Sequence, residues 1–162
     1  MTDALRATDR DHLDRAIALS RAGMEGREGG PFGAVVVLDG RVVGEGWNRV
    51  TSTADPTAHA EVVAIRDACQ RVGSFELPGA VVYASCEPCP LCWGAIHGAR
   101  CGRVVFANDA VAAAAIDFDD ALLSEELRRP LAERSIEVLH APLPSAREVF
   151  DDWAADPTLV RY

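Results

Sequence analysis

Two short segments of the sequence bring together side chains that could bind a metal ion. They are His59-Ala60-Glu61 and Pro88-Cys89-Pro90-Leu91-Cys92. Both segments stand where we expect the first turn of a helix. Cys89 and Cys92 are three positions apart, so their sulfur atoms lie on one helical face. A helix N-terminus lowers the pKa of a thiol and therefore favours the thiolate form that binds metals.

Two thiolates and one neutral imidazole would hold a zinc ion through three protein ligands and leave a fourth position open. That arrangement is typical of catalytic zinc, whereas structural zinc is closed by four protein ligands. A neighbouring carboxylate can take a proton from water, which provides hydroxide near neutral pH. The sequence therefore predicts His59, Cys89 and Cys92 as zinc ligands and Glu61 as the general acid and base.

The cysteines also allow other interpretations. A single Cys-x-x-Cys that opens a helix after a strand fits a redox pair. Cys86 adds a third cysteine at the same spacing, and with His59 the three cysteines would make a closed structural zinc site. A ferredoxin-type cluster would need a further cysteine at position 96, where Ile96 stands. The His-x-Glu segment favours the open site, and we expect Cys86 to be a small packed residue at a strand end.

The elements that must position these segments alternate between helix and strand. Apolar spacing predicts a helix over residues 9–24 and a hairpin of strands 34–38 and 41–47, with Asp39-Gly40 at its turn. The later predicted helices are one at 58–72, one from Pro88 to about residue 99, a short helix or turn at 110–116, one that ends at residue 128, and a last one at 145–155. Asp55 or Thr57 would cap the first of these, and Asp119 or Asp120 would cap the helix that ends at residue 128. The later predicted strands are 80–84, 103–107 and a fifth strand at 135–139. This order predicts an α/β sandwich with a mixed sheet, in which strands joined by helices pair in parallel.

Length and composition narrow the function classes. The chain has 162 residues, which predicts a single domain over 1–162. Its 16 basic and 25 acidic residues give a net charge of -9, so we expect no long nucleic acid as a partner. The longest uncharged stretch, 88–99, is too short to cross a membrane, and early charges leave no room for a signal peptide. Five cysteines, an odd number, indicate reduced thiols or metal ligands in the cytoplasm.

The order His-x-Glu followed by Pro-Cys-x-x-Cys is that of zinc-dependent deaminases, in which the glutamate is the acid and base and not a ligand. Other segments extend the match: Gly29-Gly30-Pro31-Phe32-Gly33-Ala34, Asn48, Asp55-Pro56-Thr57-Ala58, Ser85-Cys86-Glu87, Gly94-Ala95-Ile96 and Phe118-Asp119-Asp120. With them the chain, from about residue 12 to Tyr162, resembles the bacterial guanine deaminases of the cytidine deaminase-like superfamily.

This resemblance implies a three-layer α/β/α fold with a five-stranded mixed sheet, and a zinc-dependent conversion of guanine to xanthine and ammonia. It implies that Phe32, Asn48 and Tyr162 bind the substrate. Asp120 would contact the purine and take part in proton transfer, and the backbone near Ala60 would hold developing negative charge. The resemblance also implies a homodimer, in which the helix and tail from about residue 144 cross to the partner subunit and close its site.

One position departs from that family. Gly98, preceded by His97, stands where the family has a tryptophan, and the lost ring would leave room for a sugar. Guanosine or a related aminated heterocycle is therefore the alternative substrate. Deamination of tRNA adenosine is disfavoured, because the residues from 117 onward include eleven acidic and five basic side chains. Cytosine or cytidine lacks the support of the purine-branch segments, and a structural-zinc or redox module is the non-enzymatic alternative.

Overall fold

The computed structural model describes residues 5–118 and 120–162. The chain forms two compact units, Met1–Ser124 and Glu125–Tyr162. The first unit contains the helices α1 (Ala7–Glu25), α2 (Val50–Thr53), α3 (Ala60–Val72), α4 (Pro90–Gly98) and α5 (Ala110–Ala114), and the strands β1 (Gly33–Leu38), β2 (Arg41–Trp47), β3 (Val81–Cys86) and β4 (Arg103–Asn108). Helix α6 (Ala121–Arg128) leads into the second unit, which holds the short 3-10 helix η1 (Leu131–Glu133) and helix α7 (Pro144–Ala155).

The strands form one mixed sheet in the order β2-β1-β3-β4. Strand β1 is antiparallel to both β2 and β3, and β3 is parallel to β4 across helix α4, as the sequence predicts. The β1–β2 hairpin turns at Asp39 and Gly40, whose φ angles are 50° and 74°. Two successive left-handed residues match the twist of antiparallel strands, which is why this dipeptide is a reliable hairpin signal.

The predicted fifth strand at 135–139 is wrong, since the sheet of the described chain has four strands. Residues 135–139 form no strand, and 76% of Ile136 and 86% of Leu139 are exposed. Their β-branched composition favours an extended backbone, but a strand also needs a neighbouring strand for its hydrogen bonds. No strand lies within the described residues of the second unit to provide those bonds.

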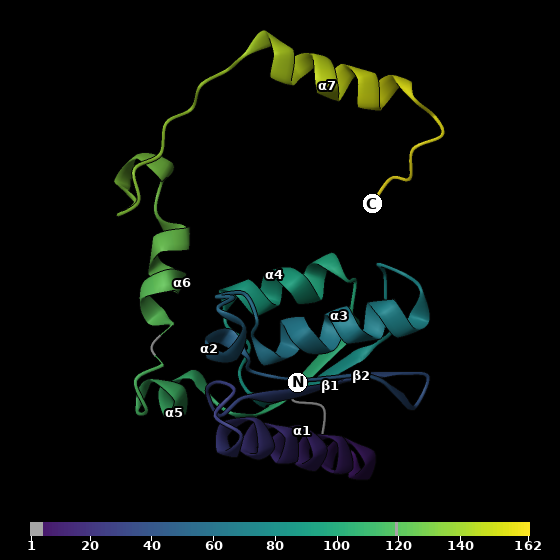
Figure 1. Cartoon of the computed structure of the whole chain (residues 1–162), viewed down its shortest axis with the longest axis vertical. Coiled ribbons are helices and arrows are strands. Elements are labelled where there is room, and N and C mark those ends of the chain that lie inside the picture. Colours follow the sequence, from purple (N-terminus) through teal and green to yellow (C-terminus); the bar gives the residue numbers. More distant parts are fainter. Residues whose placement is uncertain (1–4, 119) are drawn as a thin grey trace. The chain divides into compact units, whose positions relative to one another are not determined.

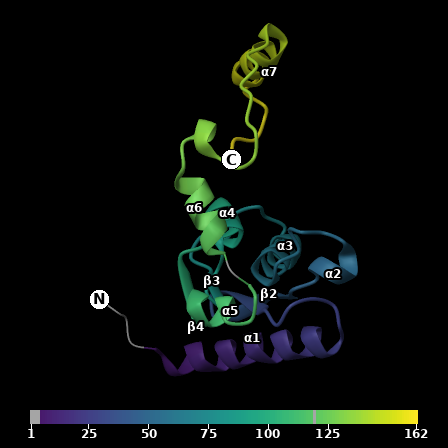
Figure 2. The same ribbon diagram turned by 90° about the vertical axis from the view of Figure 1, so that its left-hand side faces the viewer.

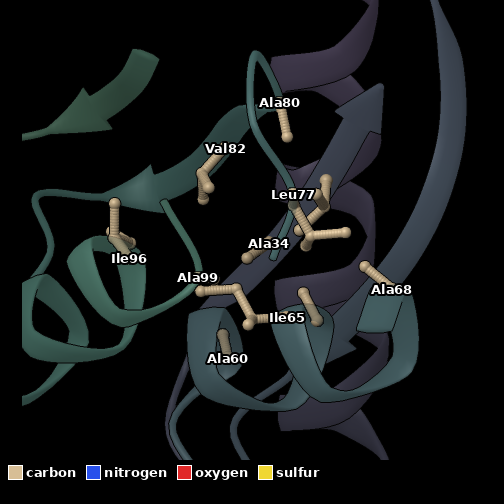
Figure 3. Packing of buried hydrophobic residues seen from close by; sticks show 11 residues of the cluster. Ala34, Ala60, Ile65, Ala68, Leu77, Ala80, Val82, Ile96 and Ala99 are labelled. Carbon is tan, nitrogen blue, oxygen red and sulfur yellow. The ribbon is translucent and has the colours of Figure 1, made fainter. Parts of the chain in front are cut away.

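The sheet of the first unit lies between two helical layers, as Figures 1 and 2 show. Alternate residues of β1 point to opposite faces. Val35 and Val37 pack with Leu13 and Leu19 of α1 on one face. The other face packs beneath α3 and α4 in the larger core, drawn in Figure 3: Ala34, Val36, Ala60, Ala64, Ile65, Ala68, Leu77, Ala80, Val82, Ile96 and Ala99. The three-layer α/β/α prediction is therefore confirmed for this unit.

Helix α3 approaches β2 closely, and this contact fixes the helix that carries the predicted catalytic glutamate. A Cβ atom added to Gly46 would lie 2.5 Å from the Ala60 carbonyl oxygen and 2.5 Å from the Ala64 nitrogen. Real Cβ atoms do not tolerate such distances to backbone atoms, so only glycine allows the first turn of α3 to lie directly on the strand.

Two helices begin at different residues from those predicted. Helix α3 begins at Ala60 with His59 in the N-cap position, so Asp55 and Thr57 do not cap it. Helix α4 begins at Pro90 with Cys89 as its N-cap. In each case the residue before the helix is a predicted metal ligand. At helix α6, Asp120 stands in the position expected of a cap residue. Its carbonyl oxygen accepts the first hydrogen bond of the helix, from the Ser124 nitrogen at 3.0 Å. Asp119, the other candidate, lies outside the described residues.

The second unit is built around α7 and the C-terminal tail. The rings of Trp153 and Tyr162 meet edge to face at 6.5 Å, and the Arg161 guanidinium lies 5.0 Å from the Trp153 ring centre. Val149 and Phe150 on the same helix remain exposed. None of the helices in the described residues has the length and apolar character needed to span a lipid bilayer.

Candidate metal centre

A turn of the chain before α3 delivers His59. The Asp55 carboxylate oxygen Oδ1 accepts hydrogen bonds from the Thr57 backbone nitrogen at 2.8 Å and from the Thr57 hydroxyl at 2.7 Å. The Ala58 carbonyl then accepts from the Arg49 nitrogen at 2.9 Å. This side-chain turn fixes the backbone just before the helix, and the His59 ring consequently has a defined direction at its N-terminus.

The three predicted ligands meet at one point. The distance from Cys89 Sγ to His59 Nδ1 is 3.4 Å, that from Cys92 Sγ to His59 Nδ1 is 3.6 Å, and the two sulfurs are 3.6 Å apart. They form the only group of three or more potential ligands found in the described part of the chain. His59 is half-buried, and both cysteines are buried.

These separations fit a zinc ion. Zinc binds sulfur at about 2.3 Å and imidazole nitrogen at about 2.0–2.1 Å, so tetrahedral geometry requires about 3.8 Å between two sulfurs and about 3.6 Å between sulfur and nitrogen. The observed distances lie within a few tenths of an ångström of these values. The arrangement offers three ligands, and Cys86 is not among them.

Cys86 instead ends strand β3. Its side chain is buried, and its thiol donates a hydrogen bond to the Asp109 carbonyl at 3.7 Å. This is the packed strand-end position that the sequence predicts for Cys86. A closed site with four protein ligands, the structural alternative, therefore has no support in the described chain.

Glu61 lies beside the ligands in the first turn of α3. Only 7% of the residue is exposed, and its Oε2 accepts a hydrogen bond from the Cys92 thiol at 3.2 Å. Residues two positions apart do not normally face each other along a helix. Here His59 precedes the helix, so its ring and the Glu61 carboxylate reach the same point around the open helix end.

The local charges favour a bound cation. The hydrogen bond with Cys92 lowers the pKa of Cys89 to about 4, against the opposing effect of burial. That same bond raises the pKa of Cys92, and the bond to Cys89 raises the pKa of His59. Burial raises the pKa of Glu61. The two sulfurs are joined by one hydrogen bond. A metal ion can replace the proton of that bond, because metal binding releases protons from its ligands.

A cavity of about 610 Å³ opens above the metal ligands. His59 and Cys89 lie in its wall, while Glu61 and Cys92 are buried behind them. The rest of its lining is mainly apolar, with a few polar groups: Gly30, Phe32, Asn48, Val50, Thr51, Cys86, Glu87, Pro88, Pro90, Trp93, Ala110, Val111, Ala113, Ala114, Phe118, Asp120, Ala121 and Ser124. Such a lining is typical of a small-molecule site.

Asn48 is oriented by the backbone around it. Its Oδ1 accepts hydrogen bonds from the nitrogens of Gly30 and Val50, both at 3.2 Å. The oxygen is thus engaged, and the group that remains for a ligand is the Nδ2 donor. The predicted substrate residue Asn48 is buried at the cavity and can recognise a hydrogen-bond acceptor.

The other predicted residues divide into three groups. Phe32 and Asp120 line the cavity, and the charge of Asp120 contributes to the raised pKa of His59. Ala60 is buried at the first position of α3, behind the cavity wall. Tyr162 belongs to the second unit, where its ring packs on Trp153.

The substrate residues predicted from the sequence did not include two aromatic residues of the wall. Phe118 packs edge to face on Phe32 at 4.8 Å, and Trp93 lines the cavity from α4. Gly98, on which the guanosine alternative rests, is not among the lining residues. One signal in the sequence could have indicated Phe118. It is an apolar residue just after the predicted short helix at 110–116, and a side chain there often packs back on the end of the helix.

Comparison with known proteins places the chain in a family. Residues 6–108 match the family model described as "Cytidine and deoxycytidylate deaminase zinc-binding region", so the chain belongs to this family and is a zinc-dependent hydrolytic deaminase. The chain is 45% identical to the guanine deaminase of Bacillus subtilis (strain 168) over 141 residues, which are 87% of this chain and 90% of that protein.

A solved structure and a second relative separate the branches of the family. An X-ray structure of the Bacillus subtilis guanine deaminase superposes with a TM-score of 0.91 at 42% identity, covering 94% of this chain and 98% of that one. A tRNA-specific adenosine deaminase of Agrobacterium fabrum is 43% identical over 99 residues, 60% of this chain and 64% of that protein. The guanine deaminase match therefore extends over more of both chains.

Proposed function

We propose that this chain hydrolyses guanine to xanthine and ammonia. The observation that carries the proposal is Glu61, a buried carboxylate beside the three predicted zinc ligands, two of which line a largely apolar cavity together with Asn48. A similarity to guanine deaminase over 87% of this chain supports the choice of substrate.

His59, Cys89 and Cys92 would hold the zinc ion. When bound, zinc supplies a Lewis acid that makes water a nucleophile near neutral pH. Glu61 would take a proton from the attacking water and pass it to the ring nitrogen next to the amine-bearing carbon, to which the water oxygen bonds. It would then transfer the remaining hydroxyl proton to the amine, which leaves as ammonia when its bond to carbon breaks. The balance is one guanine and one water converted to one xanthine and one ammonia.

The cavity wall orients the purine. The Asn48 Nδ2 group donates to an acceptor on the purine, because its oxygen is already bonded to the backbone. Phe32 and Phe118 exclude water beside the ring. Asp120 accepts from a purine N–H and assists proton transfer. The N–H of Ala60 in the first turn of α3 lacks an acceptor within the helix, so it can stabilise developing negative charge.

The test is to replace Glu61. The Glu61→Ala and Glu61→Gln variants should retain one zinc per chain and lose about 10²–10⁴-fold in turnover of guanine, the usual contribution of a general acid and base. Glu76→Ala is the matched control, since Glu76 forms an exposed ion pair with Arg100 and does not line the cavity. A Glu61→Ala enzyme with the wild-type rate would refute the mechanism.

Substrate choice is tested by measuring ammonia release from guanine and guanosine side by side. We expect turnover of guanine, because the one residue that favoured a sugar, Gly98, is not among the lining residues. Preferential turnover of guanosine would contradict the proposal. A tRNA substrate is disfavoured by the net charge of -9.

We also propose that the enzyme is a cytoplasmic homodimer in which the segment from about residue 144 closes the partner's cavity. The second unit exposes apolar side chains that could make such a contact, namely Val149, Phe150 and Tyr162. The free cysteines support a reducing compartment.

Co-expression of Glu61→Ala chains with Tyr162→Ala chains tests the exchange of this segment between subunits. Mixed dimers should regain activity that neither variant has alone, and no recovery would argue against it.

A further inference from the structure

Helix α5 begins at a junction that also starts the cysteine segment of the metal centre. Strands β3 and β4 pair up to Cys86 and Asn108, after which one chain leads to Cys89 and the other to α5. The Glu87 nitrogen donates to the Asn108 carbonyl at 2.8 Å, and the Cys86 thiol donates to the Asp109 carbonyl at 3.7 Å. Hydrogen bonds therefore join the chain that leads to Cys89 with the chain that leads to α5, just before each reaches the site.

The Glu87 side chain extends this connection to the helix itself. Its Oε2 accepts a hydrogen bond from the Ala110 nitrogen at 3.0 Å, while Asp109 accepts from the Ala112 nitrogen at 2.9 Å. Two carboxylates thus satisfy the first turn of a helix of only five residues. A helix this short is not stable alone, so its position depends on such bonds. Four of its residues, including Ala110 and Ala113, line the cavity.

The other end of α5 is fixed by Phe118. Asp117 has a left-handed φ of 69°. The Phe118 nitrogen donates to the Ala113 carbonyl and the Asp117 nitrogen donates to the Ala114 carbonyl, both at 3.1 Å. This pair of bonds is the Schellman motif, in which the following apolar residue packs back toward the helix end. The Phe118 ring meets Phe32 at 4.8 Å.

Gly30 provides the space for that ring. A Cβ atom on Gly30 would lie 2.8 Å from the Phe118 ring and 3.0 Å from the Phe32 ring. Phe118 therefore packs closely on Phe32 and Gly30 of the cavity wall although 41% of it stays exposed, and Asp120 follows it by two positions. Asp120 therefore lines the cavity shortly after α5, a helix whose two ends are both held by hydrogen bonds.

We propose that α5 is a spacer that sets the position of Asp120 relative to the zinc ligands, with Glu87 and Phe118 as positioning residues at its two ends. The proposal rests on the role proposed above for Asp120. Glu87 also lines the cavity, but its carboxylate accepts from the Ala110 nitrogen, so we assign its action to the helix and not to the substrate. Its loss then misplaces Asp120 while leaving His59, Cys89 and Cys92 in place.

A double-mutant cycle tests this coupling. Glu87→Ala should lower kcat for guanine about tenfold with little change in KM, because a small misplacement of a reacting group is costly. Glu87→Gln should recover most of the rate, since its amide oxygen can accept from Ala110. In an Asp120→Asn background, Glu87→Ala should change kcat by less than about twofold, because residues that act as a unit are not additive.

Two measurements without turnover complete the test. Glu87→Ala should speed hydrogen exchange of the amides at 110–118, and cobalt-substituted protein should keep its visible spectrum because the metal ligands do not move. Glu76→Ala is the control for both. Independent, multiplicative effects of Glu87→Ala and Asp120→Asn would overturn the proposal, as would unchanged exchange at 110–118.

The outcomes also separate this proposal from the proposed function. If wild-type enzyme releases no ammonia from guanine, the proposed function fails, and the exchange comparison still decides whether Glu87 holds α5. If wild-type enzyme is active and Asp120→Asn has the wild-type rate, the deaminase stands and the spacer proposal is refuted.

Discussion

Asp9 and Arg103 are 94 positions apart in the sequence and form a two-pronged ion pair in the first unit, at 2.8 and 3.0 Å. Only 1% of Asp9 is exposed. The carboxylate also accepts from the Tyr83 hydroxyl at 2.8 Å and from the Arg6 nitrogen at 2.9 Å. One buried carboxylate thus joins the start of α1 to strands β3 and β4, the two strands that lead into the metal centre and α5.

Loss of that pair should destabilise the fold strongly. Asp9→Asn removes the buried charge that pairs with the Arg103 guanidinium, and breaking a fully buried ion pair typically costs about 3–5 kcal/mol. Because 27% of the Arg103 side chain is exposed, we expect a loss toward the lower end of that range. Urea unfolding measures the change. Arg15→Ala is the matched control, because its pair with Glu45 is solvent-exposed and should contribute no more than about 1 kcal/mol. Equal effects of the two variants would show that Asp9 does not have this role.

The same carboxylate predicts a pH dependence. The hydrogen bond from Arg103 holds the pKa of Asp9 well below its usual range. An aspartate in the unfolded chain titrates near pH ~3.9, so below that pH the unfolded state takes up a proton that the native state does not. The stability from Asp9 is complete above that pH and is lost as the pH falls toward the native pKa.

Unfolding free energies between pH 6 and pH 3 test this sign. The wild-type value should fall more steeply than that of Asp9→Asn, which lacks the titrating group. Comparing the two slopes removes the effect of zinc loss in acid, since both proteins carry the same ligands. Parallel slopes would mean that Asp9 is not the source of the acid sensitivity.

Features that depend only on residues close together in the sequence could be predicted from it. The Asp39-Gly40 turn and the Cys89–Cys92 spacing depend on local geometry, and the structure has both where they were expected. The fifth strand could not be predicted, because residues 135–139 have strand composition and the described second unit offers no partner strand. The role of Phe118 depends on Phe32 and Gly30, which only the folded chain brings to it.

Zinc content should distinguish Cys86 from the other cysteines. Cys92→Ser and His59→Ala each remove one of three ligands and should lose stoichiometric zinc on dialysis. Cys86→Ser should retain it, because the Cys86 thiol bonds to the Asp109 carbonyl instead. Metal analysis of the purified variants measures this difference, and zinc loss from Cys86→Ser would revive the closed four-ligand site.

Two glycine substitutions should act in opposite directions. Gly46→Ala puts a Cβ 2.5 Å from the Ala60 oxygen, so α3 must shift, at a cost of about 1–3 kcal/mol. Gly94→Ala lies within α4, where an added Cβ meets nothing within 4 Å, and should stabilise by about 0.5–1 kcal/mol. Thermal unfolding compares them. A Gly46→Ala protein as stable as wild type would contradict the close contact of α3 with β2.

The turn at Asp55 should control how firmly His59 holds zinc. Asp55 does not touch the metal ligands in the described chain, but its Oδ1 fixes Thr57, two positions before His59. Asp55→Ala frees this turn, and loss of a residue that orients a ligand typically weakens metal binding about 10–100-fold.

Asp55→Asn provides the matched control, because its amide oxygen can still accept from Thr57 while the charge that faces Arg66 is lost. Release of zinc to a colorimetric chelator gives the dissociation rate of each variant. We expect faster release from Asp55→Ala and a nearly wild-type rate from Asp55→Asn. If both variants released zinc equally fast, the charge of Asp55, and not the turn that it forms, would be what positions His59.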